Sequence, residues 1–187
     1  MDSRQVIQAV QNGSLTVIED NPYYKIYDCV VKEYPAWKLF VQTSGEPISL
    51  GSAMLPLLDT QQLRQFAEAH GLVRRDNTPL EIYCYHWVER AQGPMVFDVG
   101  FVVNDDCQVM ANEHGFVCKD LPPLKVASII YQGPFPHEPM SGWGNIEWER
   151  RAQEKGLVYT ERLYRELYHA YDFEHSQHIT EIQMAIA

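Results

Sequence analysis

The sequence predicts an α+β fold of two strand-helix-strand-strand units related by a pseudo-two-fold axis. Strand-like and helix-like stretches follow one another in the same order in the two halves of the chain. A fixed shift of 85 residues also superposes the halves. It carries residues 70–73 (HGLV) onto 155–158 (KGLV), and residues 81–83 (EIY) onto 166–168 (ELY). The matched order and the matched register together indicate an internal duplication.

The individual elements follow from periodicity and from the residues that stop them. A short helix is expected near the N-terminus, with Asp2 or Ser3 as its cap and Asn12-Gly13 as its end. The first half then gives two strands in 23–45, broken at 33–35, a helix in 59–72 and strands at 80–87 and 95–103. The second half gives two strands in 116–133, a helix in 144–157 and strands at 162–171 and 179–187.

One set of alternate strand residues mixes acids with aromatic rings. Since a helix with an apolar stripe packs on one face of an antiparallel sheet, we expect these alternates to occupy the opposite face. The antiparallel sheets are then expected to form a central cleft, with the helices on the opposite face. The cleft residues expected from this pattern are Glu81, Tyr83, Tyr85, Trp87 and Asp98 from the first half, and Tyr164, Glu166, Tyr168, Glu181 and Gln183 from the second.

Three interpretations of this face remain open. Polar alternates on an antiparallel sheet are commonly just solvated. Several tyrosines and a tryptophan on one face, however, are typical of a binding site, and rings beside a carboxylate suit a flat or cationic ligand. A carboxyl group in an apolar cleft also has a raised pKa and can act as general acid or base, and repulsion between neighbouring Glu166 and Glu181 would reinforce that shift.

Other candidate sites are weaker. His169, His175 and His178 cluster in the sequence without a characteristic ligand spacing, so we expect no metal. Trp143 and Trp148 flank the start of the second helix and are more typical of a core. Trp143 nevertheless follows the loop 134–142, so it is also a candidate lid residue over the cleft.

Composition excludes several classes of function. The net charge of −10 and the pI near 5.1 argue against direct nucleic-acid binding. No stretch approaches the roughly 18 to 20 apolar residues of a membrane span, and the start does not read as a signal peptide. The four cysteines show no C-x-x-C spacing and no obvious base partner. We therefore expect a cytoplasmic protein with reduced thiols.

Four segments of the second half resemble a known family. They are LPPLKVASIIYQGPF (121–135), NIEWERRAQEKGL (145–157), RELYHAY (165–171) and TEIQMAIA (180–187). Together they resemble the GyrI-like small-molecule-binding domain, which occurs alone and as the effector domain of AraC-type and MerR-type regulators. The likeness covers about residues 22–187, with halves at about 22–108 and 109–187, and leaves 1–21 as an N-terminal extension. The segment GPFPHEPMSGWG (133–144) departs from the family pattern.

The resemblance implies a duplicated fold whose central cleft binds hydrophobic, often cationic, molecules without a cofactor. Family glutamates and rings carry over onto Glu166 and Glu181, with Tyr168 and Trp143 beside them. The first twenty residues are too short for a helix-turn-helix, so we expect a standalone binding protein for xenobiotic sensing or sequestration. The alternatives are a hydrolase of cyclopropane-containing genotoxins that uses Glu181 or Glu166 with Tyr168, and a protein-interaction role with a partner such as gyrase or a transcription regulator.

Overall fold

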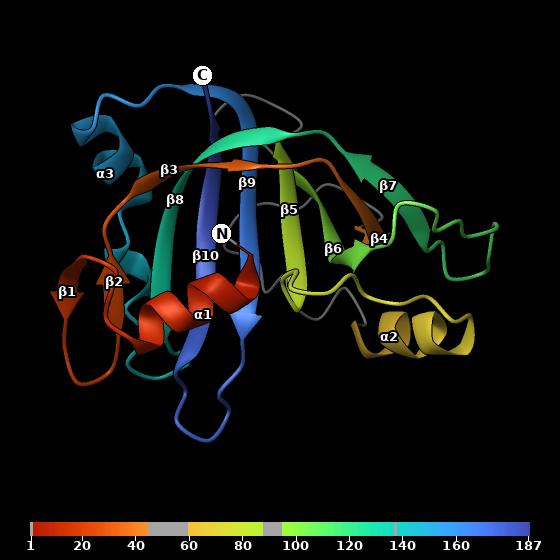
Figure 1. Cartoon of the computed structure of the whole chain (residues 1–187), viewed down its shortest axis with the longest axis horizontal. Coiled ribbons are helices and arrows are strands. Elements are labelled where there is room, and N and C mark those ends of the chain that lie inside the picture. Colours follow the sequence, from red (N-terminus) through yellow and green to blue (C-terminus); the bar gives the residue numbers. More distant parts are fainter. Residues whose placement is uncertain (1, 45–59, 88–94, 137) are drawn as a thin grey trace.

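A computed structural model of the chain describes residues 2–44, 60–87, 95–136 and 138–187 (Figure 1). In these ranges it is an α+β protein, as the sequence predicts, and its strands form a single ten-stranded sheet. None of its helices there is long and apolar enough to cross a membrane. The helices are α1 (Ser3–Gln11), α2 (Thr60–Ala69) and α3 (Trp148–Glu154), with a short 3₁₀ helix at Trp143–Asn145. The strands are β1 (Val17–Asp20), β2 (Lys25–Tyr27), β3 (Val30–Tyr34), β4 (Trp37–Thr43), β5 (Glu81–Trp87), β6 (Met95–Val103), β7 (Val117–Leu121), β8 (Leu124–Gly133), β9 (Tyr159–Ala170) and β10 (His178–Ile186).

The two halves of the sheet join at the antiparallel pair β5 and β9. The strand order is β1-β2-β8-β10-β9-β5-β6-β4-β7, and β3 also pairs with β8. In the central pair, Glu81 lies opposite Tyr168 and Tyr83 lies opposite Glu166. The 85-residue shift exchanges these two pairs, so the pseudo-two-fold axis passes between them. The duplication inferred from sequence is therefore present as symmetry in the sheet.

A second connection between the halves is a long ribbon. Val30 to Tyr34 of β3 pair with Ser128 to Leu124 of β8, and β4 pairs with β7 in the same register. The segment β3–β4 passes from one half to the other at Pro35, and the segment β7–β8 does so at Pro122-Pro123. These prolines have no N–H to donate to a strand ladder. These two segments cross the molecule side by side, as the orange and teal strands of Figure 1 show. The first half thus lends β2 and β3 to the sheet of the second half, and the second half lends β7 to the sheet of the first.

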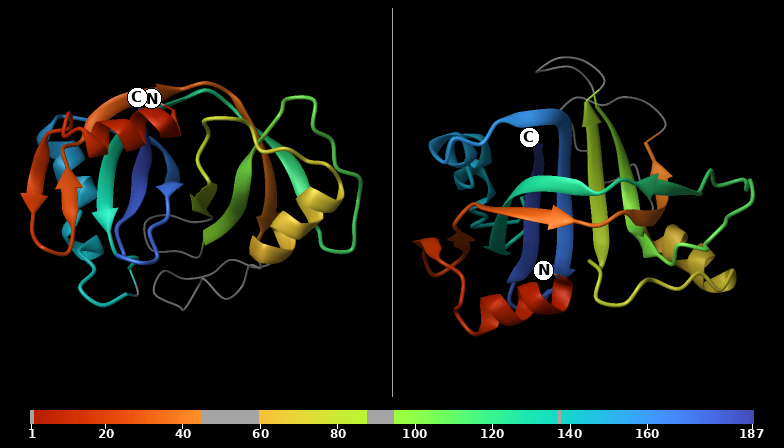
Figure 2. Two further views of the ribbon diagram at one scale, coloured as in Figure 1. Left: turned by 60° about the horizontal axis from the view of Figure 1, so that its bottom comes forward. Right: turned by 45° about the horizontal axis from the view of Figure 1, so that its top comes forward.

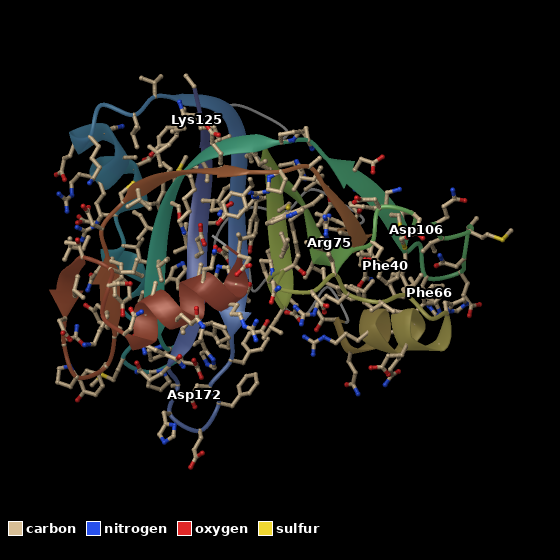
Figure 3. The ribbon with its side chains drawn as sticks, viewed as in Figure 1. Phe40, Phe66, Arg75, Asp106, Lys125 and Asp172 are labelled. Carbon is tan, nitrogen blue, oxygen red and sulfur yellow. The ribbon has the colours of Figure 1, made fainter. Side chains whose placement is uncertain are left out.

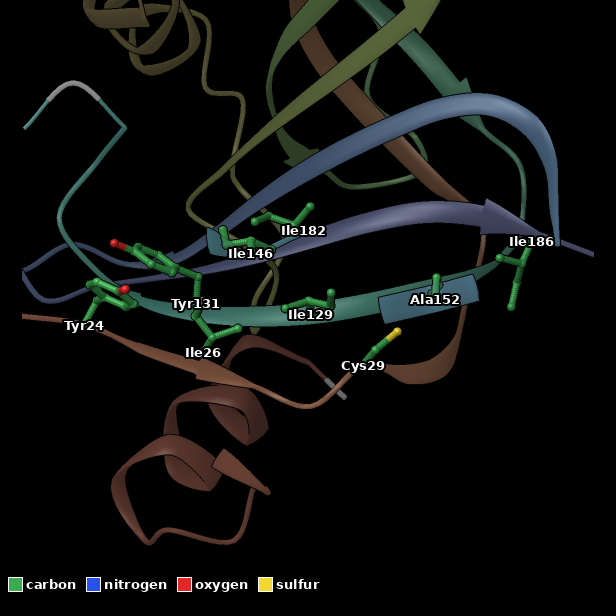
Figure 4. Packing of buried hydrophobic residues seen from close by; sticks show 10 residues of the cluster. Tyr24, Ile26, Cys29, Ile129, Tyr131, Ile146, Ala152, Ile182 and Ile186 are labelled. Carbon is green, nitrogen blue, oxygen red and sulfur yellow. The ribbon is translucent and has the colours of Figure 1, made fainter. Parts of the chain in front are cut away.

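Helices α2 and α3 cover the same face of the sheet, at its two sides. Phe66 of α2 stacks on Phe40 of β4 with ring centroids 5.9 Å apart, and both are labelled in Figure 3. Ala152 of α3 packs in the cluster of Ile129 and Ile182, which Figure 4 shows from close by. Ile182 lies beside Glu166 in the pairing of β10 with β9, so α3 is on the Glu166 face. The structure differs here from the sequence expectation, which put the helices opposite the acids and tyrosines.

The opposite face is covered by α1 and by the ribbon. Val6 of α1 packs with Tyr27, Ile130 and Ile179. Of the two expected caps, Asp2 and Ser3, the structure has Asp2, in a capping box with Gln5. The left view of Figure 2 shows α1 and the ribbon on one side of the strands and α2 on the other. Under the ribbon lies an apolar core that includes Trp37, Leu39, Ile82, Cys84, Val102, Val126 and Leu167. On the face that carries α2 and α3, by contrast, neither helix covers the central strands, so a site could lie there.

Candidate functional site

Six side chains of β5 and β9 form one row at the centre of the sheet, between the areas that α2 and α3 cover. Alternation puts them on a common face, because β5 and β9 pair in register without a shift. We call them the tyrosine–glutamate row: Glu81, Tyr83 and Tyr85 of β5, and Tyr164, Glu166 and Tyr168 of β9. The sequence predicted all six, and the structure brings them together.

Glu166 is a buried acid whose partners are tyrosines. Its two carboxylate oxygens accept hydrogen bonds of 2.8 Å, one from the hydroxyl of Tyr164 and one from the hydroxyl of Tyr168. Burial raises the pKa of Glu166, and the tyrosine hydrogen bonds oppose this only in part. Burial also raises the pKa values of Tyr164 and Tyr168 far above the usual range, so both hydroxyls stay protonated as donors. Across the described parts of the chain, no Lys, Arg or His forms an ion pair with Glu166.

Its symmetry mate Glu81 has a different environment. Arg64 of α2 forms an ion pair with one oxygen of Glu81. The other oxygen accepts a hydrogen bond of 2.7 Å from the hydroxyl of Tyr171 and a longer one, 3.4 Å, from Tyr83. Within the described residues, the duplication therefore left one acid with a cationic partner and one without.

Aromatic rings surround the two acids. Tyr83 packs against Tyr168, and Tyr85 against Tyr164, each with ring centroids 5.2 Å apart. At one end of the row Tyr168 also contacts the rings of Phe135 and Tyr171, both at 5.8 Å. At the other end Tyr164 meets Trp148 of α3, beside a small apolar pocket. That pocket is lined by Cys29, Ala127, Ile129, Trp148, Tyr159, Ile182 and Met184.

Glu181 does not lie beside Glu166, and the prediction that they are neighbours is wrong. In the pairing of β10 with β9, Glu181 lies opposite Leu167, whereas Glu166 lies opposite Ile182. The two acids therefore point to opposite faces of the sheet. Glu166 retains 8% of its surface exposed, but Glu181 retains 0%. Mutual repulsion between them is not the cause of the raised pKa of Glu166, which burial explains.

Glu181 is the centre of a closed polar network under the ribbon and α1. It forms an ion pair of 3.0 Å with Lys32 of β3 and a hydrogen bond of 3.0 Å with the ring of His169 of β9. Its Oε1 accepts hydrogen bonds from Tyr34, Ser128 and Gln183. Although burial opposes ionisation, these partners, led by the charge of Lys32, hold the pKa of Glu181 well below its usual range. Gln183 is also in this network, where it accepts hydrogen bonds from the buried Arg165.

Asp98 also lies outside the row. It sits opposite Cys84 in the pairing of β5 with β6, hence on the Glu181 side of the sheet. Its partners are Thr43, Lys119 and His86. Burial alone would raise its pKa, but hydrogen bonds from these groups outweigh burial and lower the pKa of Asp98 to about 2. The sequence placed Asp98 on the correct strand and on the wrong face.

Two tryptophans of the expected cleft have different outcomes. The ring of Trp143 packs edge-on against Tyr131 at 5.2 Å, in the cluster below α3, so its packing is that of a core residue. Trp87 pairs with Met95 through the backbone, and its side chain lies outside the described part of the structure.

The histidines do not gather into a metal site. His169 is bound to Ser3 and Glu181, His175 to Asp172, and His178 stacks on Phe135. In the described ranges no three His, Cys, Asp or Glu side chains are placed to hold a metal ion.

Three residues next to the row were missed from the sequence. Tyr171 and Phe135 reach it from loops, where alternation gives no guide to direction. Arg64 is on the polar side of a helix, and the signal for it is only its place near the middle of α2.

Comparison with known proteins found no matching family model and no matching curated protein. Solved structures do match. The C-terminal domain of EcmrR has a TM-score of 0.65 at 19% identity, over 86% of this chain and 97% of that one. SAV2435 bound to tetraphenylphosphonium has a TM-score of 0.60 at 14% identity, over 86% and 94%. A hydrolase from Listeria innocua has a TM-score of 0.51 at 11% identity, over 86% and 92%.

These likenesses extend over most of the chain and over almost all of each matched chain. The protein therefore has the GyrI-like fold that its sequence motifs implied.

Proposed function

We propose that this protein binds a hydrophobic, aromatic or cationic small molecule at the tyrosine–glutamate row, for sensing or sequestering a foreign compound. The observation that carries the proposal is the state of Glu166, an acid buried among tyrosines without a cationic partner in the described structure. Removing a carboxylate from water without pairing its charge is costly, and its raised pKa expresses that cost. A ligand cation would provide the missing charge.

Comparison with Glu181 supports this interpretation. Glu181 is buried more completely than Glu166, yet the ammonium group of Lys32 compensates its charge from within the chain. The fold is thus able to neutralise a buried acid, and at Glu166 the described residues do so only with neutral hydroxyl groups. Buried acids with perturbed pKa values are typical of functional sites. We therefore assign Glu181 to structure and Glu166 to ligand binding.

The side chains around Glu166 suit the aromatic, uncharged parts of an organic cation. The rings of Tyr83, Tyr164 and Tyr168 present faces and edges that attract an organic cation. The small pocket beside Trp148 and Tyr159 is apolar and lies next to Tyr164 through the Trp148 ring, so that end of the row also has apolar surroundings. SAV2435, which shares the fold, was solved with tetraphenylphosphonium, a cation enclosed by four phenyl rings.

Calorimetric titration with tetraphenylphosphonium tests the proposal. Glu166→Gln should weaken binding roughly tenfold or more, equivalent to about 1.4 kcal/mol. Triphenylphosphine oxide, a neutral aromatic probe, should bind the two proteins alike. The control is Glu149→Gln, an exposed acid of α3 whose substitution makes the same change in net charge. Equal affinity of tetraphenylphosphonium for the unmodified protein and for Glu166→Gln would refute the proposal.

A second candidate function is hydrolysis at the same site. It is favoured by the raised pKa of Glu166, because a buried carboxyl group of this kind can transfer a proton to or from a bound molecule or water. Tyr168, hydrogen-bonded to Glu166, would position the substrate. Incubation with a cyclopropane-containing electrophile should then give a product heavier by one water, detected by mass spectrometry and lost in Glu166→Gln. Binding without turnover would leave the first function alone.

A further inference from the structure

Two of the four cysteines are in direct contact. Cys107 lies in the connection between β6 and β7, and Cys118 lies on β7. Their sulfur atoms are 3.2 Å apart. Both are partly exposed, whereas Cys29 and Cys84 are buried in separate clusters, each 1% exposed. In the described structure the reachable thiols are therefore also the paired ones.

We propose that Cys107 and Cys118 are a redox-active pair that closes reversibly to a disulfide with a low-molecular-weight disulfide, such as oxidised glutathione, as oxidant. A disulfide bond is about 2.05 Å long, so the sulfurs need to approach by only about 1.2 Å. Cys107 is in an irregular connection and is free of a strand ladder, so it can make this movement while Cys118 stays paired with Phe40 in the sheet.

The surroundings of the two sulfurs indicate which of them reacts first with the oxidant. Burial raises the pKa of the Cys118 thiol to about 12, and the hydrogen bond with Cys107 adds to the effect. Cys118 is also held in the strand ladder opposite Phe40, whereas Cys107 lies in an irregular connection, so we take Cys107 as the sulfur that reacts first.

The exchange proceeds through a mixed disulfide. The Cys107 thiolate attacks one sulfur of oxidised glutathione, forms a new S–S bond and releases one glutathione thiolate. Cys118 then loses its proton to that thiolate or to water and attacks Cys107, which releases the second glutathione. Two protein thiols are oxidised and one glutathione disulfide is reduced to two thiols.

The disulfide would close the segment from Cys107 to Cys118 into a loop. That segment is green at the right of Figure 1 and carries Phe116, which packs on Phe40 and Phe66 under α2. Closing a loop restricts the unfolded chain and thereby stabilises the folded one. Oxidation should thus fix the β6–β7 connection onto the core of the first half, away from the tyrosine–glutamate row.

The test uses the full chain treated with oxidised glutathione and then labelled with a maleimide in denaturant. We expect labelling to fall from four thiols to two, the intact mass to fall by two hydrogens, and a proteolytic map to join Cys107 to Cys118. Dithiothreitol should reverse all three results, and the Tm of the oxidised monomer should exceed that of the reduced one.

Matched variants separate this pair from other thiols. Cys107→Ser should retain at most a glutathione adduct on Cys118 and lose the rise in Tm, whereas Cys84→Ser should oxidise as the unmodified protein does. The map on the unmodified protein decides the question even where a variant does not fold. Four labelled thiols after treatment, a link to Cys29 or Cys84, or only dimers between chains would each overturn the proposal.

Discussion

Glu166 of β9 lies directly opposite Tyr83 of β5, and the pseudo-two-fold axis turns this pair into Tyr168 opposite Glu81. A glutamate opposite a tyrosine therefore occurs twice around one axis, but among the described residues only Glu81 has a cationic partner, Arg64.

Neutralising the two buried acids of β9 and β10 should have opposite effects on stability. Glu166 has a raised pKa in the folded state, so stability declines as pH rises from 4.5 through that raised value, and Glu166→Gln should increase Tm at neutral pH. Glu181→Gln leaves the buried Lys32 without its counter-charge and should cost about 3 to 5 kcal/mol. Thermal unfolding checks both, and a loss of stability in Glu166→Gln would contradict our account of that acid.

Cation binding should depend on pH through Glu166. Only the carboxylate attracts a cation, so affinity for tetraphenylphosphonium should fall as pH drops through the raised pKa, at a higher pH than for an ordinary glutamate. A bound cation favours ionisation, so binding near that pH should release protons. Calorimetry in two buffers of different ionisation enthalpy measures the release. In Glu166→Gln both effects should disappear.

The hydroxyl groups of Tyr164 and Tyr168 should set the pH at which cation binding is half lost. Tyr164→Phe or Tyr168→Phe removes one hydrogen bond to the carboxylate, so the pKa of Glu166 should rise further and the midpoint of binding should move upward. The control is Tyr159→Phe, because the Tyr159 hydroxyl is buried without a hydrogen-bond partner in the described structure. The midpoint measured in that variant should match the unmodified protein.

Asp98 should contribute stability that acid removes. Its folded pKa of about 2 lies below the ordinary value of 3.8, so the contribution is complete above 3.8 and is lost as pH falls from 3.8 to about 2. Asp98→Asn should cost about 2 kcal/mol at neutral pH and make stability less dependent on pH in that window. Denaturant unfolding at several pH values tests this. An unchanged pH profile would show that Asp98 is not the group responsible.

Gly100 of β6 should not accept a side chain. A Cβ there would lie 1.9 Å from the carbonyl oxygen of Phe40 in the neighbouring strand β4, where the backbone has no room to withdraw. Gly100→Ala should cost about 3 kcal/mol. Gly144→Ala is the matched control, since nothing lies within 4 Å of its Cβ position. Similar Tm values for the two variants would be contrary to this packing.

Local signals in the sequence were sufficient for the elements and their duplication. The stops at Gly71 and Gly156, and the acid-x-tyrosine strands after them, depend on short-range chemistry and repeat at one interval. Which face each strand shows to its neighbour depends on register, and one residue of slip reverses it. Alternation alone therefore grouped the six residues of β5 and β9 on one face correctly, but put that face on the side away from the helices and gave Glu181 and Asp98 the wrong side.

The exchange of strands between the halves could not be predicted from the sequence either. Val30 pairs with Ser128, 98 positions later in the chain, and no local pattern indicates so distant a partner. Because β3 and β7 each complete the sheet of the other half, neither half can close its own sheet alone. We infer that the two halves unfold in one cooperative transition, and that refolding is slow for the size of the chain because its ribbon forms only after a long loop has closed.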